Sequence, residues 1–363
     1  MAARTNTTPS PLLLDAPFRP YAFHSLTPDT SITKFAYFCG HEQWQPEVLV
    51  RHAVLAEEAG FDMVVVSEHF HPWVDDVGAA GFAFATIGAI AQATTTVEIA
   101  TGVTTPLFRY HPGVVAQAAA TLDRLSAGRF RLGIGTGENL NEGPLDYEFP
   151  RYAERANRIT EAIEIMRALL GGEKLSYNGS YYRTDRAKLY SPPTGHVPIW
   201  LAAGGPKSAA LAARLADGII TSVKSPKGTR ERVLKPAQAA AAAAGRRPPQ
   251  ILASRWSIFA DTADEAWEAL AAWRGLRAPG RLEAVDPMDL RQRADAMPRD
   301  EVIAQYAVVS SADEYVETYL PLVSEVDANV VTIQTTSLDQ EATIALLGRD
   351  VLPRLRASAT SSS

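Results

Sequence analysis

The chain has 363 residues, of which 46% are hydrophobic and 21% charged, and its formal net charge at pH 7 is −6. This length suits one large α/β barrel or two modest domains; there is no basic excess to indicate nucleic acid as a partner, and no apolar run approaches the roughly 20 residues that span a bilayer. The single cysteine, Cys39, excludes an internal disulfide and a cysteine-based metal cluster, so we expect a cytoplasmic protein.

The two ends of the chain differ in composition from the rest. Residues 1–31 are rich in Thr, Pro and Ser and have no helical period, which predicts an extended N-terminal arm. Residues 357–363 have a similar composition and predict a disordered tail. Between them, residues 32–356 are expected to form a single domain.

Within this domain, strand-like apolar runs alternate with amphipathic helical runs. The expected strands are 34–39, 62–66, 97–103, 130–135, 199–203, 218–221, 251–258 and 330–335. The expected helices are 46–59, 112–125, 151–170, 207–216 and 338–352, and the alanine run 239–244 also predicts a helix. Repeated β-then-α units with short connections indicate a parallel sheet, and about eight of them favour a (β/α)8 TIM barrel over an open sheet.

Two segments do not fit the repeat. Residues 172–196 are rich in Gly, Tyr and Pro and predict an inserted hairpin and loop. Residues 274–300 are charged and interrupted by prolines, which makes them a candidate lid over the mouth of the barrel.

Polar side chains follow three of the expected strands. They are His41 and Glu42, then 67–73 (Ser-Glu-His-Phe-His-Pro-Trp), then 135–142 (Gly-Thr-Gly-Glu-Asn-Leu-Asn-Glu). The carboxyl ends of barrel strands share one face, so an imidazole and several carboxylates should meet there, as acid–base chemistry requires. His69, flanked by Glu68 and Trp73, is the candidate base, whereas His41 and His71 are interpreted as loop residues. No close histidine spacing suggests a metal site, and none is predicted.

A different kind of site is indicated by residues 202–208, where an expected strand turns through Gly204 and Gly205 into a helix. Backbone N–H groups at such a turn bind phosphate well, and Pro206 suits the first helical turn. The same sequence also suits an ordinary β-to-α corner, so an anion site is one of two interpretations.

With these motifs, residues 34–355 resemble the luciferase-like monooxygenase superfamily, and within it the F420-dependent glucose-6-phosphate dehydrogenase group. The matching stretches are 67–73, 104–112 (Thr-Thr-Pro-Leu-Phe-Arg-Tyr-His-Pro), 133–142 and 202–206. The resemblance implies a TIM barrel of the bacterial luciferase type with insertion segments, a homodimer, and coenzyme F420 bound with its deazaflavin ring near the barrel mouth.

The same resemblance implies roles for individual residues. His69 would be the base that takes the substrate hydroxyl proton as hydride leaves carbon for C5 of the deazaflavin, and Trp73 would pack over the reacting centre. Glu138 would act as the acid toward the reduced ring, and Glu42 matches a further active-site carboxylate. Contacts to the cofactor would come from Glu68, Gly102, Val103, Thr105, Gly135, Thr136, Asn141, Ala203, Gly204 and Gly205. Glu68 replaces the usual aspartate, and Gly102–Val103 matches the position of a non-prolyl cis peptide.

For the substrate, the resemblance points to Thr221, Lys224, Arg281 and Gln305. In the sugar-phosphate enzymes two lysines and an arginine hold the phosphate. Lys224 matches the first lysine, Arg281 takes the second position, and Gln305 stands where the arginine is expected. A sugar phosphate, a neutral alcohol and a hemiacetal therefore all remain open.

Two other functions compete with an F420-dependent dehydrogenase. One is an FMN-dependent monooxygenase on the same barrel, and the other is a non-catalytic F420 carrier. The combination of His69, Trp73 and Glu138 favours the dehydrogenase, because oxygenation needs no base for an alcohol and a carrier needs no acid–base groups.

Overall fold

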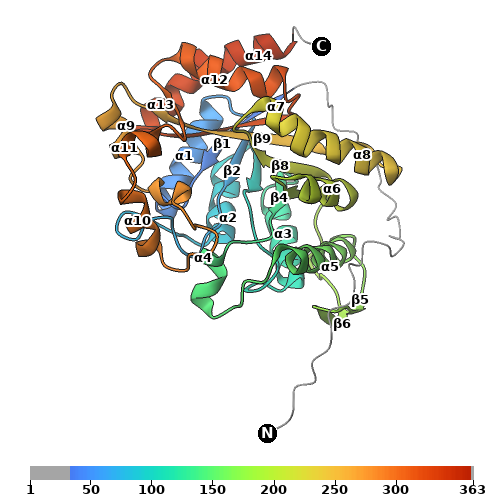
Figure 1. Ribbon diagram of the computed structural model, residues 1–363. Coiled ribbons are helices and arrows are strands. Elements are labelled where there is room, and N and C mark those ends of the chain that lie inside the picture. The colour runs from blue at the N-terminus through green and yellow to red at the C-terminus, as the bar shows by residue number, and fades with distance from the viewer. Residues whose placement is uncertain (1–32, 361–363) are drawn as a thin grey trace.

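Eight parallel strands form a closed ring in the computed structural model, which describes residues 33–360 (Figure 1). The strands of the ring are β1 (Lys34–Cys39), β2 (Met63–Val66), β3 (Glu98–Thr101), β4 (Phe130–Ile134), β7 (Ile199–Ala202), β8 (Gly218–Ser222), β9 (Gln250–Phe259) and β11 (Val330–Thr336). Strand β1 pairs with β2 on one side and β11 on the other, and β8 pairs with β9, so the ring closes without a free edge. The predicted (β/α)8 TIM barrel is confirmed.

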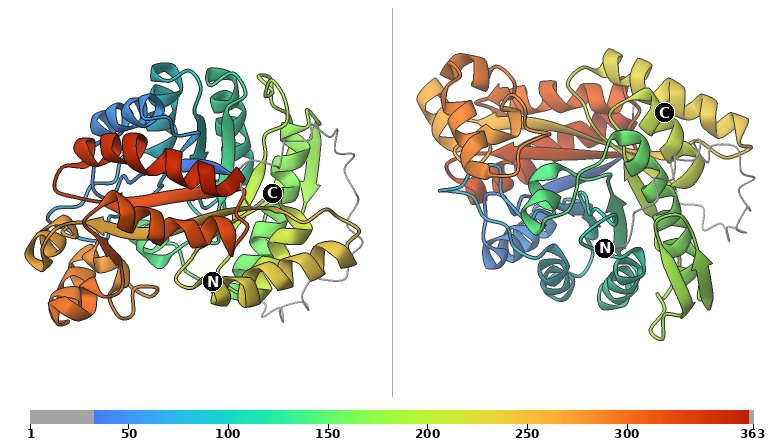
Figure 2. Two further views of the ribbon diagram at one scale, coloured as in Figure 1. Left: turned by 90° about the horizontal axis from the view of Figure 1, so that it is seen from above. Right: turned by 60° about the horizontal axis from the view of Figure 1, so that its bottom comes forward.

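These segments form buried parallel strands because they are nearly continuous apolar runs, as strands covered on both faces require. All four residues of β2, for example, are buried. A short strand, β10 (Ala307–Val309), pairs with β9 outside the ring. The predicted hairpin insertion is present as β5 (Leu175–Asn178) and β6 (Arg183–Ala187), which lie beside α5 and away from the barrel (Figure 2).

Helices surround the ring and cover its outer face (Figures 1 and 2). They are α1 (Pro46–Glu58), α2 (Ala83–Ala93), α3 (Pro112–Leu125), α4 (Asn139–Glu142), α5 (Tyr152–Leu170), α6 (Pro206–Leu215), α7 (Pro226–Thr229), α8 (Lys235–Ala243), α9 (Ala263–Ala269), α10 (Pro287–Asp295), α11 (Arg299–Ile303), α12 (Ala312–Ser324), α13 (Gln340–Leu346) and α14 (Leu352–Thr360). Among residues 33–360, no helix is both long and apolar enough to cross a membrane.

Helices α2 and α12 are the longest of several helices that lie where the sequence analysis named none. The sequence of α2 holds only Ala, Phe, Thr, Ile, Gly and Gln, and no side chain caps its N-terminus, so the polar face and start signal that mark a helix are weak. Helix α12 contains Pro321, a residue that normally interrupts a helical pattern.

The chain ends differ from the expected boundaries. The predicted closing helix at 338–352 is α13, which continues through a wider π-type turn at Leu347–Val351 into α14. Helix α14 runs to Thr360, so residues 357–360, which were assigned to a disordered tail, are helical. The expected arm, residues 1–31, and residues 361–363 lie outside the described residues.

An aromatic group fills the ring interior below the mouth. Trp256 packs on Trp273 with ring centres 4.3 Å apart, and Phe38 lies 5.6 Å from Trp256. Tyr306 donates a hydrogen bond of 3.0 Å to the Trp273 carbonyl oxygen. These buried rings form a rigid apolar base under the loops that follow the strands.

Glu57 at the end of α1 holds the start of β3. Its carboxylate accepts hydrogen bonds from the backbone N–H groups of Thr95 (2.9 Å), Thr96 (2.5 Å) and Val97 (3.0 Å). Partial burial acts to raise the pKa of Glu57, but these N–H groups and the Thr96 hydroxyl outweigh it and bring the pKa to about 2. The ionised carboxylate is therefore the form that stabilises the fold.

Replacing Glu57 with glutamine should lower the free energy of unfolding at pH 7 by about 1–2 kcal/mol, after allowing for solvent screening. Because the pKa is lower in the folded state, this stabilisation is complete above about pH 4.5 and disappears as the pH falls toward 2. Urea unfolding at pH 7 and pH 3 measures the difference. An equal loss at both pH values would show that the carboxylate charge is not the cause.

Candidate active site

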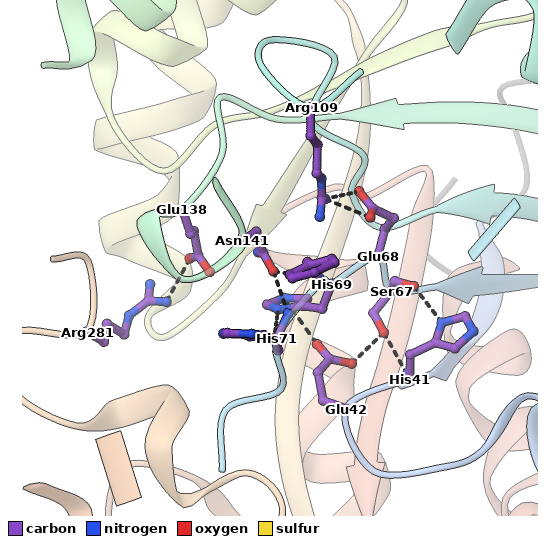
Figure 3. A network of polar contacts seen from close by, with 11 residues as sticks. His41, Glu42, Ser67, Glu68, His69, His71, Arg109, Glu138, Asn141 and Arg281 are labelled. Carbon is purple, nitrogen blue, oxygen red and sulfur yellow. Dashed lines mark hydrogen bonds and ion pairs between the residues drawn. The ribbon is translucent and has the colours of Figure 1, made fainter. Parts of the chain in front are cut away.

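The loops after β1, β2, β3 and β4 bring the predicted acid–base residues together at one end of the barrel (Figure 3). The Nε2 atom of His69 lies 3.4 Å from Oε1 of Glu42, and its Nδ1 atom lies 3.0 Å from the backbone oxygen of His71. A carbonyl oxygen only accepts, so Nδ1 donates to it, whereas Nε2 faces the Glu42 carboxylate. The imidazole is therefore held between the His71 carbonyl oxygen and the Glu42 carboxylate.

Glu42 is fixed by a second layer of polar residues. Its Oε2 accepts a hydrogen bond of 2.5 Å from the Ser67 hydroxyl, which itself accepts one of 2.8 Å from the backbone N–H of His41. The His41 ring lies 2.7 Å from the Ser67 carbonyl oxygen and 2.9 Å from the hydroxyl of Thr86. Burial lowers the pKa of His41, so this neutral ring positions Ser67 and, through it, Glu42.

Trp73 packs against the base. Its ring lies 4.8 Å from that of His69 in an edge-on arrangement, and the side chain is buried. The Arg281 guanidinium lies over the Trp73 ring at 5.5 Å and also forms a 2.8 Å ion pair with Glu138. The sequence analysis gave Glu138 the role of an acid and Arg281 that of a substrate ligand. The structure pairs these two residues directly.

A buried cluster of alternating charge lies behind Glu68. The Nη2 atom of Arg109 lies 2.7 Å from both carboxylate oxygens of Glu68, and its Nε atom is 3.8 Å from Glu142. Burial raises the pKa of both carboxyls, that of Glu142 to about 7, while Arg109 acts to lower them. One guanidinium therefore compensates two carboxyl groups that water does not reach.

Several predicted cofactor residues surround this cluster. The side-chain oxygen Oδ1 of Asn141 accepts a 2.8 Å hydrogen bond from the backbone N–H of Phe70, which anchors the loop that carries His69. The Gly102–Val103 peptide bond is cis, as the resemblance implies. Thr105 is buried in the loop after β3.

The turn after β7 is open. A Cβ added to Gly204 or to Gly205 would meet no atom within 4 Å, whereas Ala203 beside them is buried. Gly135 and Thr136 lie in the neighbouring loop after β4. Open space above bare backbone at the start of α6 suits an anionic group of a ligand.

Three cations face the other side of the mouth. The pKa of Lys224 is lowered first by the positive charge of Arg277, then by burial and by Arg281, which places the three groups near one another. The Nε of Arg277 is buried without a hydrogen-bond partner among residues 33–360, and its guanidinium lies 5.6 Å from the centre of the Tyr306 ring. Like charges held together in this way favour an anion as the ligand.

The other two predicted substrate residues are Thr221 and Gln305. Thr221 is buried in β8. Gln305 follows α11, and its amide lies 3.5 Å from the backbone oxygen of Glu301 on an exposed surface. A cation that the sequence analysis did not select, Arg277, instead lies near Lys224.

The 274–300 segment covers the mouth, where a lid was expected. It contains α10 and packs directly on the β2–α2 loop, because a Cβ on Gly275 would lie 2.0 Å from the carbonyl oxygen of Trp73. His71 Nδ1 lies 3.1 Å from the backbone oxygen of Val285, which joins the segment to the β2–α2 loop at a second point. An open pocket lies between the two, lined in part by Phe70 and Pro287.

The sequence analysis also left out Arg109, Ser67 and Glu142. All three lie in quoted motifs, but their roles depend on partners distant in the chain, such as Glu68, which is 41 residues from Arg109. A charged residue within the loop that follows a barrel strand, here β3, is the signal that could have selected Arg109.

Comparison with known proteins agrees with this geometry. Residues 33–325 match the sequence model of the family described as luciferase-like monooxygenase. The chain belongs to this family. Solved structures similar to this chain include an F420-dependent secondary alcohol dehydrogenase in complex with an F420–acetone adduct. It is 31% identical, has a TM-score of 0.83, and is matched over 90% of this chain and 99% of that chain.

Two relatives found by sequence are named as F420-dependent dehydrogenases. The chain is 40% identical over 325 residues to an F420-dependent glucose-6-phosphate dehydrogenase of Nocardia farcinica, covering 88% of this chain and 96% of the relative. It is 37% identical over 333 residues to an F420-dependent hydroxymycolic acid dehydrogenase of Mycobacterium tuberculosis, covering 91% and 90%. The named substrates of these three proteins differ, whereas the cofactor is the same.

Proposed function

We propose that this protein is an F420-dependent dehydrogenase that oxidises a hydroxyl-bearing carbon, with His69 as the base. The observation that carries the proposal is the placement of His69, whose Nε2 atom lies 3.4 Å from Glu42 Oε1 while Nδ1 is held by the His71 carbonyl oxygen. An alcohol can lose hydride only as its hydroxyl proton leaves, so the reaction needs a base. Two relatives that are 37–40% identical to this chain are named as F420-dependent, which supports F420 as the cofactor.

The residues at the mouth fit this cofactor. The open turn at Gly204 and Gly205 would hold its phosphate, and the loop containing Gly102, Val103 and Thr105 would lie against the ring. When bound, F420 supplies a two-electron acceptor for hydride.

The chain's own groups then carry the proton. His69 Nε2 takes the hydroxyl proton, and the imidazolium that forms faces the buried Glu42 carboxylate, which stabilises the new charge. Trp73 and the 274–300 segment exclude water from the reacting carbon. Arg281 occupies the Glu138 carboxylate in an ion pair of 2.8 Å, so Glu138 would be released toward the cofactor only when that pair opens.

We further propose that the substrate carries an anionic group such as a phosphate. Lys224, Arg277 and Arg281 would bind it, because a cluster that lowers the pKa of its own lysine is relieved by a negative charge. Arg277 would replace the contact that Gln305 does not supply. Each lost charge-assisted hydrogen bond should cost about 1.5–3 kcal/mol of binding.

The test follows the visible absorbance of oxidised F420 with glucose 6-phosphate, glucose and 2-propanol. Loss of absorbance with the phosphate is expected, and Arg277→Gln should lower kcat/KM for it by about 10–100-fold without affecting neutral alcohols. The exposed Lys174→Gln serves as the matched control. Reduction by neutral alcohols alone would contradict the anionic substrate, and F420 binding without any reduction would favour a carrier.

Homodimer formation is also proposed. Helices α2 and α3 pack side by side and expose Phe82, Val114 and Leu125, apolar side chains that a second copy could cover. Sedimentation of Val114→Glu against the wild type would test it. A cytoplasmic location is proposed from the lone Cys39, whose thiol is free and buried.

A further inference from the structure

Glu142 is a buried carboxyl group that the proposed reaction does not use. It ends the short helix α4, its side chain is fully buried, and neither of its oxygens has a hydrogen-bond partner among residues 33–360. The Nε atom of Arg109 lies 3.8 Å from Glu142 Oε1 and has no hydrogen-bond partner within that range either. A closure of about 1 Å would bring these two groups to hydrogen-bond distance.

Arg109 divides its guanidinium between two carboxyl groups. Its Nη2 atom lies 2.7 Å from both oxygens of Glu68, whereas its Nε atom faces Glu142 (Figure 3 shows the contact with Glu68). Because the guanidinium is a rigid plane, a movement that brings Nε onto Glu142 also shifts Nη2 relative to Glu68. The two carboxyl groups therefore compete for one cation.

This competition acts on the loop at 67–73, which carries the proposed base. Glu68 belongs to that loop, so its ion pair ties the loop to the segment after β3. Asn141, the residue before Glu142 on α4, ties the same loop to the segment after β4, because its Oδ1 accepts a 2.8 Å hydrogen bond from the Phe70 N–H. Both ties end within one residue of the two competing carboxyl groups.

The groups that face Glu142 leave Arg109 as its counter-charge within the described part of the chain. They are Arg109 and Tyr110 from the loop after β3, Glu68 from the loop after β2, and Tyr182 from the hairpin insertion. Burial raises the pKa of both tyrosine hydroxyls, that of Tyr110 to about 12, so neither becomes charged near neutral pH. Burial also raises the pKa of Glu142 to about 7, against the opposing charge of Arg109.

We propose that Glu142 is a positioning residue whose proton decides which carboxyl group Arg109 holds. With the proton bound, Glu142 is neutral and the guanidinium stays on Glu68, which fixes the 67–73 loop. When the proton leaves to solvent, the new carboxylate attracts Arg109, the contact with Glu68 lengthens and the loop loosens. The inference rests on the proposed function only in its consequence, since the loop carries His69.

The test is hydrogen exchange of the backbone N–H groups at 67–73, measured on the full chain without added ligand between pH 6 and pH 8.5. Protection is expressed relative to an unstructured peptide at the same pH. We expect it to fall about fivefold or more over this range in the wild type, because local opening becomes easier. Glu142→Gln keeps the shape of the neutral carboxyl group and cannot ionise, so its protection should stay within about twofold of the wild-type value at pH 6.

The matched control is Glu148→Gln, the same substitution at an exposed carboxylate six residues further along the chain. Its protection should follow that of the wild type at every pH. Wild-type protection that does not depend on pH, or a fall that persists in Glu142→Gln, would overturn the proposal. If Glu142→Gln does not fold, Glu142→Leu, which also cannot ionise, takes its place.

Fluorescence titration of F420 on the same samples separates this inference from the proposed function. Failure of F420 to bind at any pH would overturn the proposed function, and the exchange data would still decide the role of Glu142. Binding of F420 to a protein whose 67–73 loop is equally protected at pH 6 and pH 8.5 would overturn the positioning role alone.

Discussion

Replacing His69 with alanine is expected to lower kcat by about 10²–10⁴-fold while the affinity for F420 stays within about twofold. The ring lies at the mouth with Nε2 beside Glu42, so its removal deletes the proton acceptor and leaves the proposed cofactor cradle at Gly204 and Gly205 intact. Single-turnover absorbance of F420 measures the chemical step, and a separate fluorescence titration measures cofactor binding.

The matched control is His71→Ala, which removes an imidazole from the same loop. The His71 ring points to Val285 and only its backbone oxygen contacts His69, so the chemical step should be nearly unchanged. A kcat loss in His69→Ala no larger than that of the control would disprove the base assignment. Equal losses of turnover and F420 affinity would instead assign His69 to cofactor binding.

Replacing Arg109 with methionine should destabilise the protein by about 3–5 kcal/mol at pH 8, because two buried carboxylates then lack a counter-charge. Arg109 is the cation that contacts both Glu68 and Glu142. Without it the pKa of each carboxyl should rise further, since burial already acts in that direction. Raised carboxyl pKa values in the folded state mean that stability falls as the pH rises above about 4.5, so the loss at pH 5 should be smaller.

Urea unfolding at pH 5 and pH 8 measures this difference. Arg51→Met is the control, because Arg51 pairs with Glu341 on the surface, where the side chains are 66% and 42% exposed. That variant should lose less than about 1 kcal/mol at either pH. A loss for Arg109→Met that does not depend on pH would show that packing, and not charge, sets its cost.

The fold could be read from the sequence to the extent that its signals are local. Parallel barrel strands are apolar on both faces, so runs such as β2 are visible without any knowledge of their partners. The convergence of Glu42 and His69 followed from the barrel, because residues directly after its strands share one face. Helix α2 was not predicted because it has neither a polar face nor a side-chain cap.

The parts of the site that could not be predicted depend on contacts between distant segments. Arg277 belongs to the segment over the mouth, and only the packing of that segment on Trp73 brings it to Lys224. The pairing of Arg281 with Glu138 joins residues 143 positions apart, so the sequence could assign each a role but not the interaction. Single-residue motifs identify chemical groups, whereas their charge state is set by neighbours from other loops.

The pairing of Arg281 with Glu138 has a consequence for how this enzyme would recognise its substrate. An anion drawn to Lys224 and Arg277 competes for Arg281, and every molecule that wins the competition releases Glu138 from its ion pair. Binding of the anion and release of Glu138 are then coupled, and each favours the other. A neutral alcohol would enter the same mouth without exchanging partners. Charged and neutral substrates would therefore differ in kcat as well as in affinity, because only a charged substrate would release Glu138 from Arg281.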